Sequence, residues 1–328
     1  MTTRRNFVVV LGTTLASWPL PGRAQRPAKV PHIGYLSRGT VESNGAFLGA
    51  FKDGLRELGY VDGKNIAIDV RWAGPMASAF PQLAATLVKE KPTAIITTCI
   101  PSTRAAKDAT RTIPVVMSVD GDPVAAGIVA SLAHPGANVT GTSTLFEELI
   151  PKWLELLVAA VPKAREIAIL RNPESGAGLY FSAKFEEAAQ RVNVRILPFE
   201  AHVPAELDRA FAQMKTQNAG ALIVMTDAFM ASEVDRIVPL ADRYKLPAIY
   251  GFREFAEAGG MMSYGLSYRD YYKGVARYLD AVLKGTKPAD LPVEQPTRIE
   301  LVVNLKTARK LGVSMPPQLL ARADRVIT

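Results

Sequence analysis

Polar side chains able to bind a small molecule recur directly after short apolar runs in this 328-residue chain. In the first half they are Ser37, Thr97, Thr98, Ser102, Asp120 and Asp122, together with the thiol of Cys99 and the ring of Pro101. In the second half they are Asn172 and Asp227, together with Tyr250 and Tyr264. Hydroxyls and carboxylates orient a polar solute, and aromatic rings suit its apolar part. We interpret all of these as candidate ligand-binding residues.

Some candidates have an alternative role as helix caps. Ser102, Asp122 and Asp227 stand where helices are expected to begin, and Pro123 follows Asp122. Ser and Asp are favoured N-caps, and Pro is favoured at the first helical position. A cap can still line a cleft, because the free N–H groups of a first helical turn bind anions. We expect Thr98, Ser102 and the N–H groups that follow to hold a carboxylate, and Asp122 or Asp227 to accept a hydrogen bond from an amine.

The other candidates have alternatives of a different kind. Tyr250 and Tyr264 are equally suited to a core, and Asn172 followed by Pro173 fits a simple turn. If the tyrosines face a cleft, we expect them to contact an apolar side chain of the ligand.

Catalysis has little support in the sequence. Cys99 is the only cysteine, so no internal disulfide forms, and a nucleophilic thiol also needs a base and an orienting group. His32, His134 and His202 lie outside the candidate loops and share no metal-ligand spacing. Nucleophile-elbow, dinucleotide-binding and Walker A motifs are missing. We expect no enzymatic activity, no metal and no cofactor, with Cys99 lining a cleft or lying buried.

Short apolar runs alternate along the chain with segments of helical spacing. Strands are expected at 32–36, 65–72, 94–98, 114–118, 166–170, 194–197, 221–225, 248–250, 261–264 and 299–303. Helices are expected at 46–58, 79–90, 102–110, 124–133, 149–161, 178–192, 205–216, 231–244, 271–284 and 305–311. This alternation predicts parallel sheets that carry helices on both faces.

The elements form two consecutive series of similar size, separated by the turn-rich run 134–141. We predict an α/β fold of two Rossmann-like, doubly wound parallel-sheet lobes joined by a hinge. The N-terminal lobe comprises 30–143 plus a helix at about 267–285. The C-terminal lobe comprises 144–264 plus a segment at about 297–328.

A cleft between the lobes is the expected ligand site. In open α/β sheets, ligands bind outside the carboxyl ends of the strands. The candidate loops all follow strands, so two lobes that face each other would bring them together. The hinge is expected near 141–144 and near 264–265.

Residues 1–24 have the pattern of an export signal. Arg4-Arg5 precede an apolar run over 8–18, and small residues lead to a cleavage site after Ala24. The run is shorter than the roughly 20 residues of a membrane-spanning helix. The arginine pair is typical of twin-arginine signals, with an ordinary Sec signal as the alternative. We expect a periplasmic location and no membrane insertion of the mature chain.

The charge and the length of the chain indicate which kinds of molecule it binds. The formal charge of +8 falls to +5 when the three arginines of residues 1–24 are removed, and acids and bases are interspersed. No basic run of the nucleic-acid-binding type occurs. About 300 mature residues can bury a core without disulfides. We expect a monomer that binds a small-molecule solute and no nucleic acid.

Long runs of the chain resemble one family. The run from Asp122-Pro-Val-Ala-Ala-Gly127 to His134-Pro-Gly-Ala-Asn-Val-Thr-Gly141 resembles the signature of the ABC transporter substrate-binding family that includes tryptophan-binding TrpX-type receptors. Gly259-Gly-Met-Met-Ser-Tyr-Gly265 does so as well. The tail, through 291–296, 303–308 and 320–324, is similar to a subgroup of soil α-proteobacteria. The resemblance spans nearly the whole mature chain.

The resemblance implies a type I periplasmic-binding fold, closure on a solute, and delivery to an ABC permease in the inner membrane. Some members are similar to aromatic amino-acid receptors. Their loop after the third strand usually reads Gly-Thr-Pro-Ala, whereas here it reads Thr98-Cys-Ile-Pro-Ser102. Because this loop lies in the expected pocket, the ligand of this chain can differ from theirs. An exported enzyme and a ligand sensor on the same scaffold are the alternatives.

Overall fold

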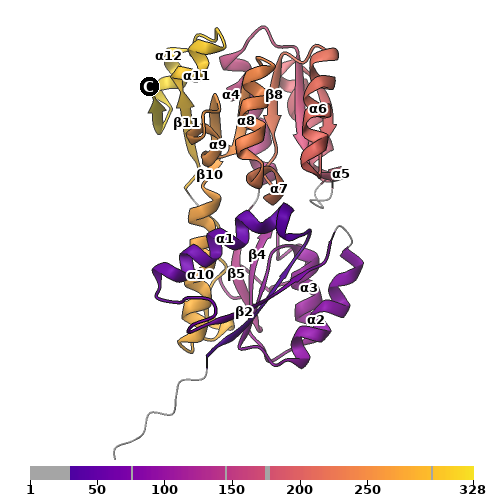
Figure 1. Ribbon diagram of the computed structural model, residues 1–328, viewed down its shortest axis with the longest axis vertical. Helices are drawn as coiled ribbons and strands as arrows, with labels where there is room; N and C mark the ends of the chain where they lie inside the picture. Colours follow the sequence, from indigo (N-terminus) through magenta and orange to yellow (C-terminus); the bar gives the residue numbers. More distant parts are fainter. Residues whose placement is uncertain (1–29, 75–76, 145, 174–177, 297) are drawn as a thin grey trace, which may run out of the picture.

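The computed structural model describes residues 30–74, 77–144, 146–173, 178–296 and 298–328, and it shows two α/β lobes arranged end to end (Figure 1). The expected fold class, two lobes built on doubly wound sheets, is confirmed. The predicted signal peptide, residues 1–24, lies outside the described residues.

The N-terminal lobe contains a five-stranded parallel sheet in the order β2-β1-β3-β4-β5 within the described chain. Its strands are β1 (His32–Ser37), β2 (Ala67–Trp72), β3 (Ala94–Thr97), β4 (Val115–Asp120) and β5 (Val139–Thr144). Its helices are α1 (Val41–Glu57), η1 (Ala77–Ala79), α2 (Phe80–Lys89) and α3 (Ile100–Ala109). Neighbouring residues of β3 face opposite ways, since Ile96 packs in the core with α1 and Ile95 in the core with α2 and α3. Burial on both faces explains the continuous apolar runs of these strands.

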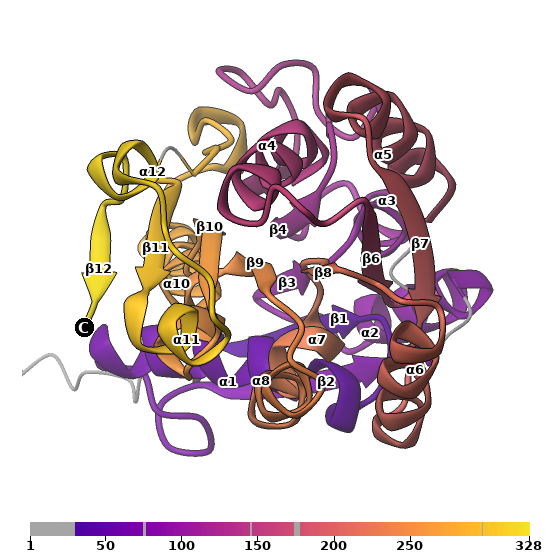
Figure 2. The same cartoon turned by 90° about the horizontal axis from the view of Figure 1, so that it is seen from above.

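The C-terminal lobe contains a seven-stranded sheet in the order β12-β11-β10-β9-β8-β6-β7 within the described chain. Its strands are β6 (Glu166–Arg171), β7 (Arg195–Glu200), β8 (Ala221–Val224), β9 (Ala248–Phe252), β10 (Met262–Leu266), β11 (Glu300–Asn304) and β12 (Arg325–Ile327). Figure 2 shows β12 at one edge of this sheet and β7 at the other. The β10–β11 pair is antiparallel, and the other pairs are parallel.

Helices flank this second sheet as they flank the first. They are η2 (Phe146–Leu149), α4 (Ile150–Ala160), α5 (Gly178–Val192), α6 (Pro204–Thr216), α7 (Ala228–Ser232), α8 (Val234–Arg243), α9 (Arg253–Glu257), α11 (Leu305–Lys310) and α12 (Pro317–Ala321). The single helix expected at 231–244 is divided, because Glu233 ends α7 and begins α8. The short elements α9, α12 and β12 have no counterpart among the sequence predictions.

Helix α10 (Tyr268–Leu283) follows a strand of the C-terminal lobe but packs in the N-terminal lobe, beside α1 (Figure 1). The two helices approach closely at Gly54, where a Cβ would lie 2.8 Å from Cα of Lys273. The chain leaves the N-terminal lobe at Thr144 and continues in the C-terminal lobe at Phe146, crosses back at 266–268, and returns to the C-terminal lobe between Glu294, after η4 (Pro288–Asp290), and Glu300. The first two passages adjoin the expected hinge segments.

The helix expected at 124–133 does not form, and the segment is a series of turns instead. Gly127 has φ of +66°, which interrupts a right-handed helix. Lys107 of α3 donates to the carbonyl oxygens of Gly127 and Ile128, each at 2.8 Å, and Arg104 donates to that of Ala126. These side chains satisfy carbonyls that a helix would satisfy with its own N–H groups.

Candidate functional site

The first candidate position lies where the strand order of the N-terminal sheet reverses, between β1 and β3. Ser37 ends β1 and Thr98 follows β3, and their hydroxyl oxygens are 2.8 Å apart. The order 2-1-3-4-5 places the binding crevice of flavodoxin-like sheets at this junction. Ser37 is buried and Thr98 is half-buried. The structure therefore brings together two candidates that are 61 residues apart in sequence.

Other candidates nearby serve mainly to build the first turn of α3. The Ser102 hydroxyl accepts from the N–H of Thr98 (3.2 Å) and of Cys99 (3.1 Å) and donates to the Cys99 carbonyl oxygen (2.9 Å). Thr97 pairs with Thr103 through their hydroxyls at 2.8 Å. Thr97 and Ser102 are fully buried, whereas Pro101 is exposed in the first turn. Ser102 is therefore not the N-cap that was expected, because α3 begins two residues earlier; it lies in the first turn, where its hydroxyl accepts from the backbone of the N-cap residue Cys99. These contacts fix the loop that carries Thr98.

Cys99 is the N-cap of α3, and the residue is half-buried. Burial raises the pKa of Cys99, and hydrogen bonds from Ser102 together with the nearby charge of Arg38 lower it by less. The thiol is therefore poorly suited to nucleophilic attack. Arg38, half-buried directly after Ser37, brings positive charge to this junction. Arg38 lies in a loop that the rule of strand carboxyl ends indicates, but it is not among the candidate residues singled out from the sequence.

The two acidic candidates of this lobe lie at the end of β4 and directly after it. Asp120 ends that strand, and its side chain lies outside the description. Asp122 is exposed, and its carboxylate accepts from the N–H of Val124 (2.7 Å) and of Ala125 (3.1 Å). It thus caps a turn, where a helix N-cap was expected.

The C-terminal lobe repeats the strand-order reversal between β6 and β8. Asn172 follows β6 and is half-buried. Asp227 follows β8 and caps α7, where its Oδ1 accepts from the N–H of Met230 at 2.7 Å. Helix α7 packs against α1 of the other lobe, so Asp227 lies close to the junction between the lobes.

Tyr250 belongs to the core of the C-terminal lobe, and Tyr264 packs against that core. Tyr250 is 1% exposed and stacks on Phe255, with ring centroids 4.7 Å apart. Tyr264 is half-buried on β10, and its carbonyl oxygen accepts from the indole N–H of Trp153 at 2.6 Å. Both placements fit the core alternative.

Aromatic rings from both lobes form a cluster that sequence reasoning misses. We call it the interlobe aromatic cluster: Phe47, Phe146, Phe252, Tyr268 and Tyr272. Phe47 of α1 contacts Tyr272 (centroids 4.7 Å apart) and Phe252 at the end of β9 (6.1 Å). Burial raises the pKa of Tyr272 well above its usual value. The cluster closes one side of the junction between the lobes with apolar surface.

His32, Asp69 and Glu90 offer ligand atoms within 4.8 Å of one another, a grouping that the spacing of the histidines does not reveal. Arg71 bridges both carboxylates, at 2.6 Å from Asp69 and 2.8 Å from Glu90. The Arg71 guanidinium already supplies the positive charge that would attract a metal ion to these carboxylates. We therefore interpret His32, Asp69 and Glu90 with Arg71 as an ion-pair cluster.

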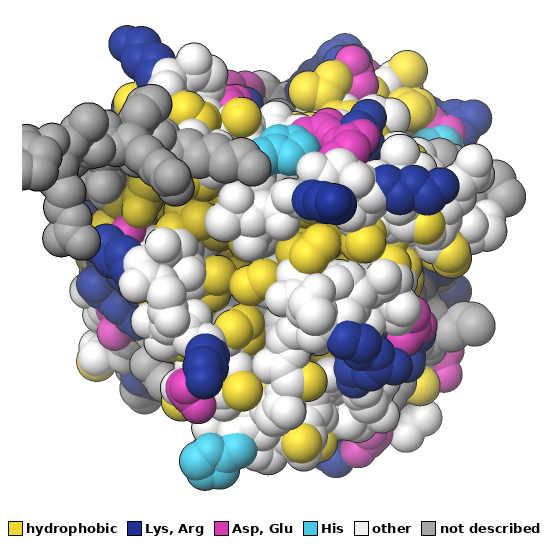
Figure 3. Space-filling view, turned by 90° about the horizontal axis from the view of Figure 1, so that it is seen from below, with side chains coloured by type: hydrophobic (Ala, Val, Ile, Leu, Met, Phe, Trp, Pro, Cys, Tyr) yellow, Lys and Arg dark blue, Asp and Glu magenta, His cyan; other side chains and the backbone are white. Residues whose placement is uncertain are grey.

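The base of the N-terminal lobe carries basic, acidic and apolar side chains interspersed with one another (Figure 3). Among the described residues, no helix is both long enough and apolar enough to cross a membrane.

The two lobes and their parallel sheets define an α/β fold of the type I periplasmic-binding class. A solute-binding protein from Agrobacterium vitis with bound allitol shares this fold at a TM-score of 0.55 and 14% identity, covering 81% of this chain and 93% of that one. Residues 41–327 match the family model described as "ABC transporter substrate binding protein". The chain belongs to this family, a family of binding proteins and not of enzymes.

Two of the more similar relatives bind aromatic amino acids. A "Tyrosine-binding protein" from Clostridioides difficile is 29% identical over 263 residues, which is 80% of this chain and 75% of the relative. A Streptococcus pneumonia domain in complex with L-Trp matches at a TM-score of 0.71 and 26% identity, covering 90% of this chain and 99% of that one. A ligand-free, open substrate-binding protein from Clostridium difficile matches at 0.56, also with 26% identity, covering 91% and 100%.

Proposed function

We propose that this chain is an exported periplasmic receptor that reversibly captures an amino acid or another small carboxylate with an aromatic group. The solute binds in the cleft between the lobes and is released to a permease in the inner membrane. Two features together carry the proposal. One is the hydrogen-bonded pair of hydroxyls of Ser37 and Thr98, which we call the hydroxyl junction. The other is the interlobe aromatic cluster. The tyrosine-binding and L-Trp-bound relatives support the same ligand class.

The carboxylate of the solute is assigned to the N-terminal lobe. Ser37 and Thr98 supply hydroxyl donors, and Arg38 supplies positive charge beside them. Such groups hold a carboxylate through charge-assisted hydrogen bonds. Asp227 of the opposite lobe is the candidate partner for an amine, because a capping carboxylate retains further acceptor capacity.

The aromatic side group is assigned to the interlobe aromatic cluster. Phe47 and Phe252 belong to opposite lobes, so a ring bound against them would favour the closed arrangement. The lobes are arranged more as in the L-Trp complex, at a TM-score of 0.71, than as in the ligand-free, open relative, at 0.56. Hinge closure of this kind is a known transition in periplasmic binding proteins.

Export completes the proposal. Residues 1–24 direct the chain to the periplasm by the twin-arginine route, and cleavage follows Ala24. The mature chain acts as a diffusing monomer. N-terminal sequencing of protein recovered from a periplasmic fraction tests the cleavage site directly.

A thermal-shift screen of residues 25–328 tests the ligand class. The panel contains amino acids, aromatic carboxylates without an amine, amides and sugars. A ligand at about 100 times its dissociation constant should add about 2.7 kcal/mol to the free energy of unfolding. Selective shifts with aromatic amino acids or aromatic carboxylates, and recovery of the ligand unchanged, are expected. Shifts with sugars alone, or consumption of the ligand, would overturn the proposal.

A further inference from the structure

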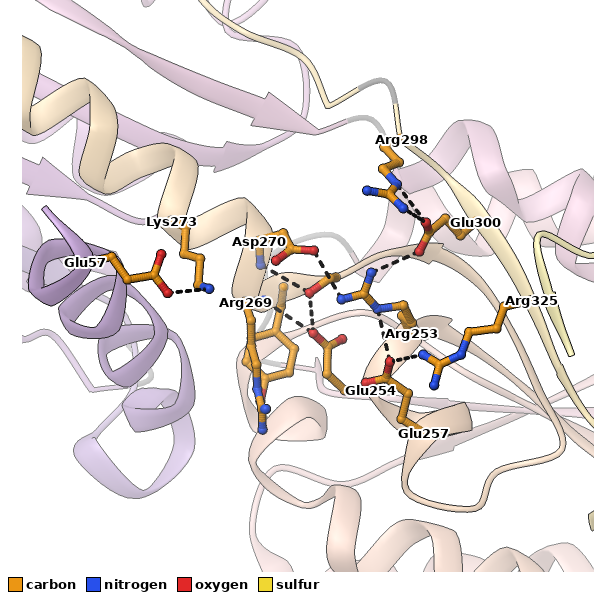
Figure 4. Close-up of polar contacts among 12 residues, drawn as sticks. Glu57, Arg253, Glu254, Glu257, Arg269, Asp270, Lys273, Arg298, Glu300 and Arg325 are labelled. Atoms are coloured by element: carbon orange, nitrogen blue, oxygen red, sulfur yellow. Dashed lines mark hydrogen bonds and ion pairs between the residues drawn. The ribbon is translucent and has the colours of Figure 1, made fainter. Parts of the chain in front are cut away.

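Helix α9 of the C-terminal lobe contacts the first turn of α10 at the point where the chain enters the N-terminal lobe (Figure 4). Arg253 and Glu254, the first two residues of α9, make these contacts, and we call this pair the α10 clamp. Neither residue belongs to the proposed ligand site.

Glu254 of the clamp binds the N-terminal end of α10. Its Oε1 accepts from the Ser267 hydroxyl at 2.6 Å and from the N–H of Arg269 at 3.4 Å. Ser267 is itself the N-cap of α10 and accepts from the N–H of Asp270 at 3.1 Å. A carboxylate is favoured at a helix N-terminus by the partial positive charge there. Glu254 is only 6% exposed, so this interaction is shielded from solvent.

Arg253 of the clamp joins three separate segments. Its Nη2 lies 3.1 Å from Asp270 on α10, its Nη1 lies 3.0 Å from Glu300 at the start of β11, and its Nε lies 3.4 Å from Glu257 on α9. Two passages between the lobes, at 266–268 and 294–300, are thereby tied to one guanidinium (Figure 4). The Arg253 side chain is 21% exposed, so its ion pairs are less screened than those of a fully exposed arginine.

Helix α10 packs as part of the N-terminal lobe, so the contacts of α9 with α10 connect the C-terminal lobe to the N-terminal lobe. It lies against α1, where Lys273 pairs with Glu57 at 2.6 Å and Gly54 allows the close approach. It also carries Tyr268 and Tyr272 of the interlobe aromatic cluster. The angle between α9 and α10 is therefore tied to the angle between the lobes.

We propose that Arg253 and Glu254 are positioning residues for closure: they hold α10 in the orientation that lets Phe47 and Tyr268 meet Phe252 across the lobes. Loss of the clamp frees the passage at 266–268, and the ligand-free protein becomes more open. Because only the closed population holds the solute tightly, apparent affinity then falls with that population. The affinity consequence rests on the proposed function, whereas the shape consequence does not.

The test compares Arg253→Met, Glu254→Gln and Asp270→Asn with the unaltered mature chain. Small-angle X-ray scattering without ligand gives the radius of gyration, and stopped-flow fluorescence with L-tryptophan gives the association and dissociation rates. We expect a larger radius of gyration and an affinity about fivefold weaker, mainly through faster dissociation. Asp270 is 56% exposed, so its variant keeps the test open if a change at the buried clamp prevents folding.

Arg325→Met is the matched control. Arg325 pairs with Glu257 at 2.7 Å in the same network but does not contact α10 (Figure 4). It should leave the radius of gyration and the rates unchanged. Identical scattering of the clamp variants and the unaltered chain would overturn the proposal, as would an equal change in Arg325→Met. If L-tryptophan does not bind the unaltered chain, the ligand assignment fails, and scattering alone decides on the clamp.

Discussion

Phe47 of α1 and Phe252 at the end of β9 meet edge to face across the two lobes, with ring centroids 6.1 Å apart and ring planes at 88°. Each ring also contacts Tyr268 of α10. An aromatic contact between the lobes exists only while the lobes are close together. The attraction between these rings therefore favours the closed arrangement of the lobes. This relationship leads to the first prediction.

Phe47→Ala should weaken binding of L-tryptophan by about tenfold. The variant loses the ring contacts across the lobes, which are worth about 0.5–1.5 kcal/mol beyond the burial of area, and it also loses that buried area. Calorimetric titration measures the change. Phe211→Leu is the control, because Phe211 contacts Tyr244 within the C-terminal lobe alone. It should lower the melting temperature and keep the affinity. Equal affinity of Phe47→Ala and the unaltered chain would show that the interlobe aromatic cluster does not contribute to binding.

Thr98→Val should weaken binding about fivefold, because a neutral hydrogen bond contributes about 1 kcal/mol. The change keeps the shape of the side chain and deletes the hydroxyl that lies 2.8 Å from Ser37. The neighbouring Thr97→Val removes a buried hydroxyl that bonds Thr103. That variant should lose thermal stability and keep its affinity. The hydroxyl junction has no role in binding if the two variants give the opposite pattern.

Asp227→Asn should separate the capping role of this residue from ligand binding. Asn is as good an N-cap as Asp, so α7 and the melting temperature should be preserved. The loss of negative charge should weaken binding of L-tryptophan while leaving 3-phenylpropionate, which has no amine, unaffected. Parallel titrations with the two compounds check this. Equal losses for both ligands would show that Asp227 does not bind an amine.

Cys99 should remain a protonated thiol at neutral pH, because burial raises its pKa above the ordinary value of 9.0. The raised pKa means that folding favours the neutral thiol, so its contribution to stability is full below pH 9.0 and is lost as pH rises through the folded pKa. Urea unfolding between about pH 7 and about pH 10 should show a steeper loss of free energy in the unaltered chain than in Cys99→Ser. Iodoacetamide should label the folded protein far more slowly than the unfolded protein. Equal labelling rates would show an accessible, ionised thiol instead.

Most strands and helices could be predicted from the sequence, because buried parallel strands such as Ala94–Thr97 are continuous apolar runs between turn residues. The segment 124–133 could not. Its apolar spacing fits a helix, but Gly127 and the side chains of Arg104 and Lys107 decide the outcome. Contacts that satisfy backbone carbonyls from another helix are not visible in local spacing.

The arrangement of the candidate site residues was predictable only in part. The rule of strand carboxyl ends brings Ser37 and Thr98 together, since it needs the strand order alone. It does not distinguish Tyr250 from Phe252, which lie two residues apart on β9. The first stacks inside the lobe and the second reaches the other lobe. Pairs such as Phe47 and Tyr272 depend on how the two lobes pack, which a single sequence does not reveal.

Isothermal titration of the ligand-stripped mature chain with L-tryptophan and L-tyrosine is the decisive experiment for the proposed function. We expect saturable one-to-one binding of at least one of them and recovery of the amino acid unchanged. We also expect Phe47→Ala and Thr98→Val to weaken this binding. Binding that neither variant affects, absence of saturable heat with both ligands, or consumption of the ligand would show that the proposed function is wrong.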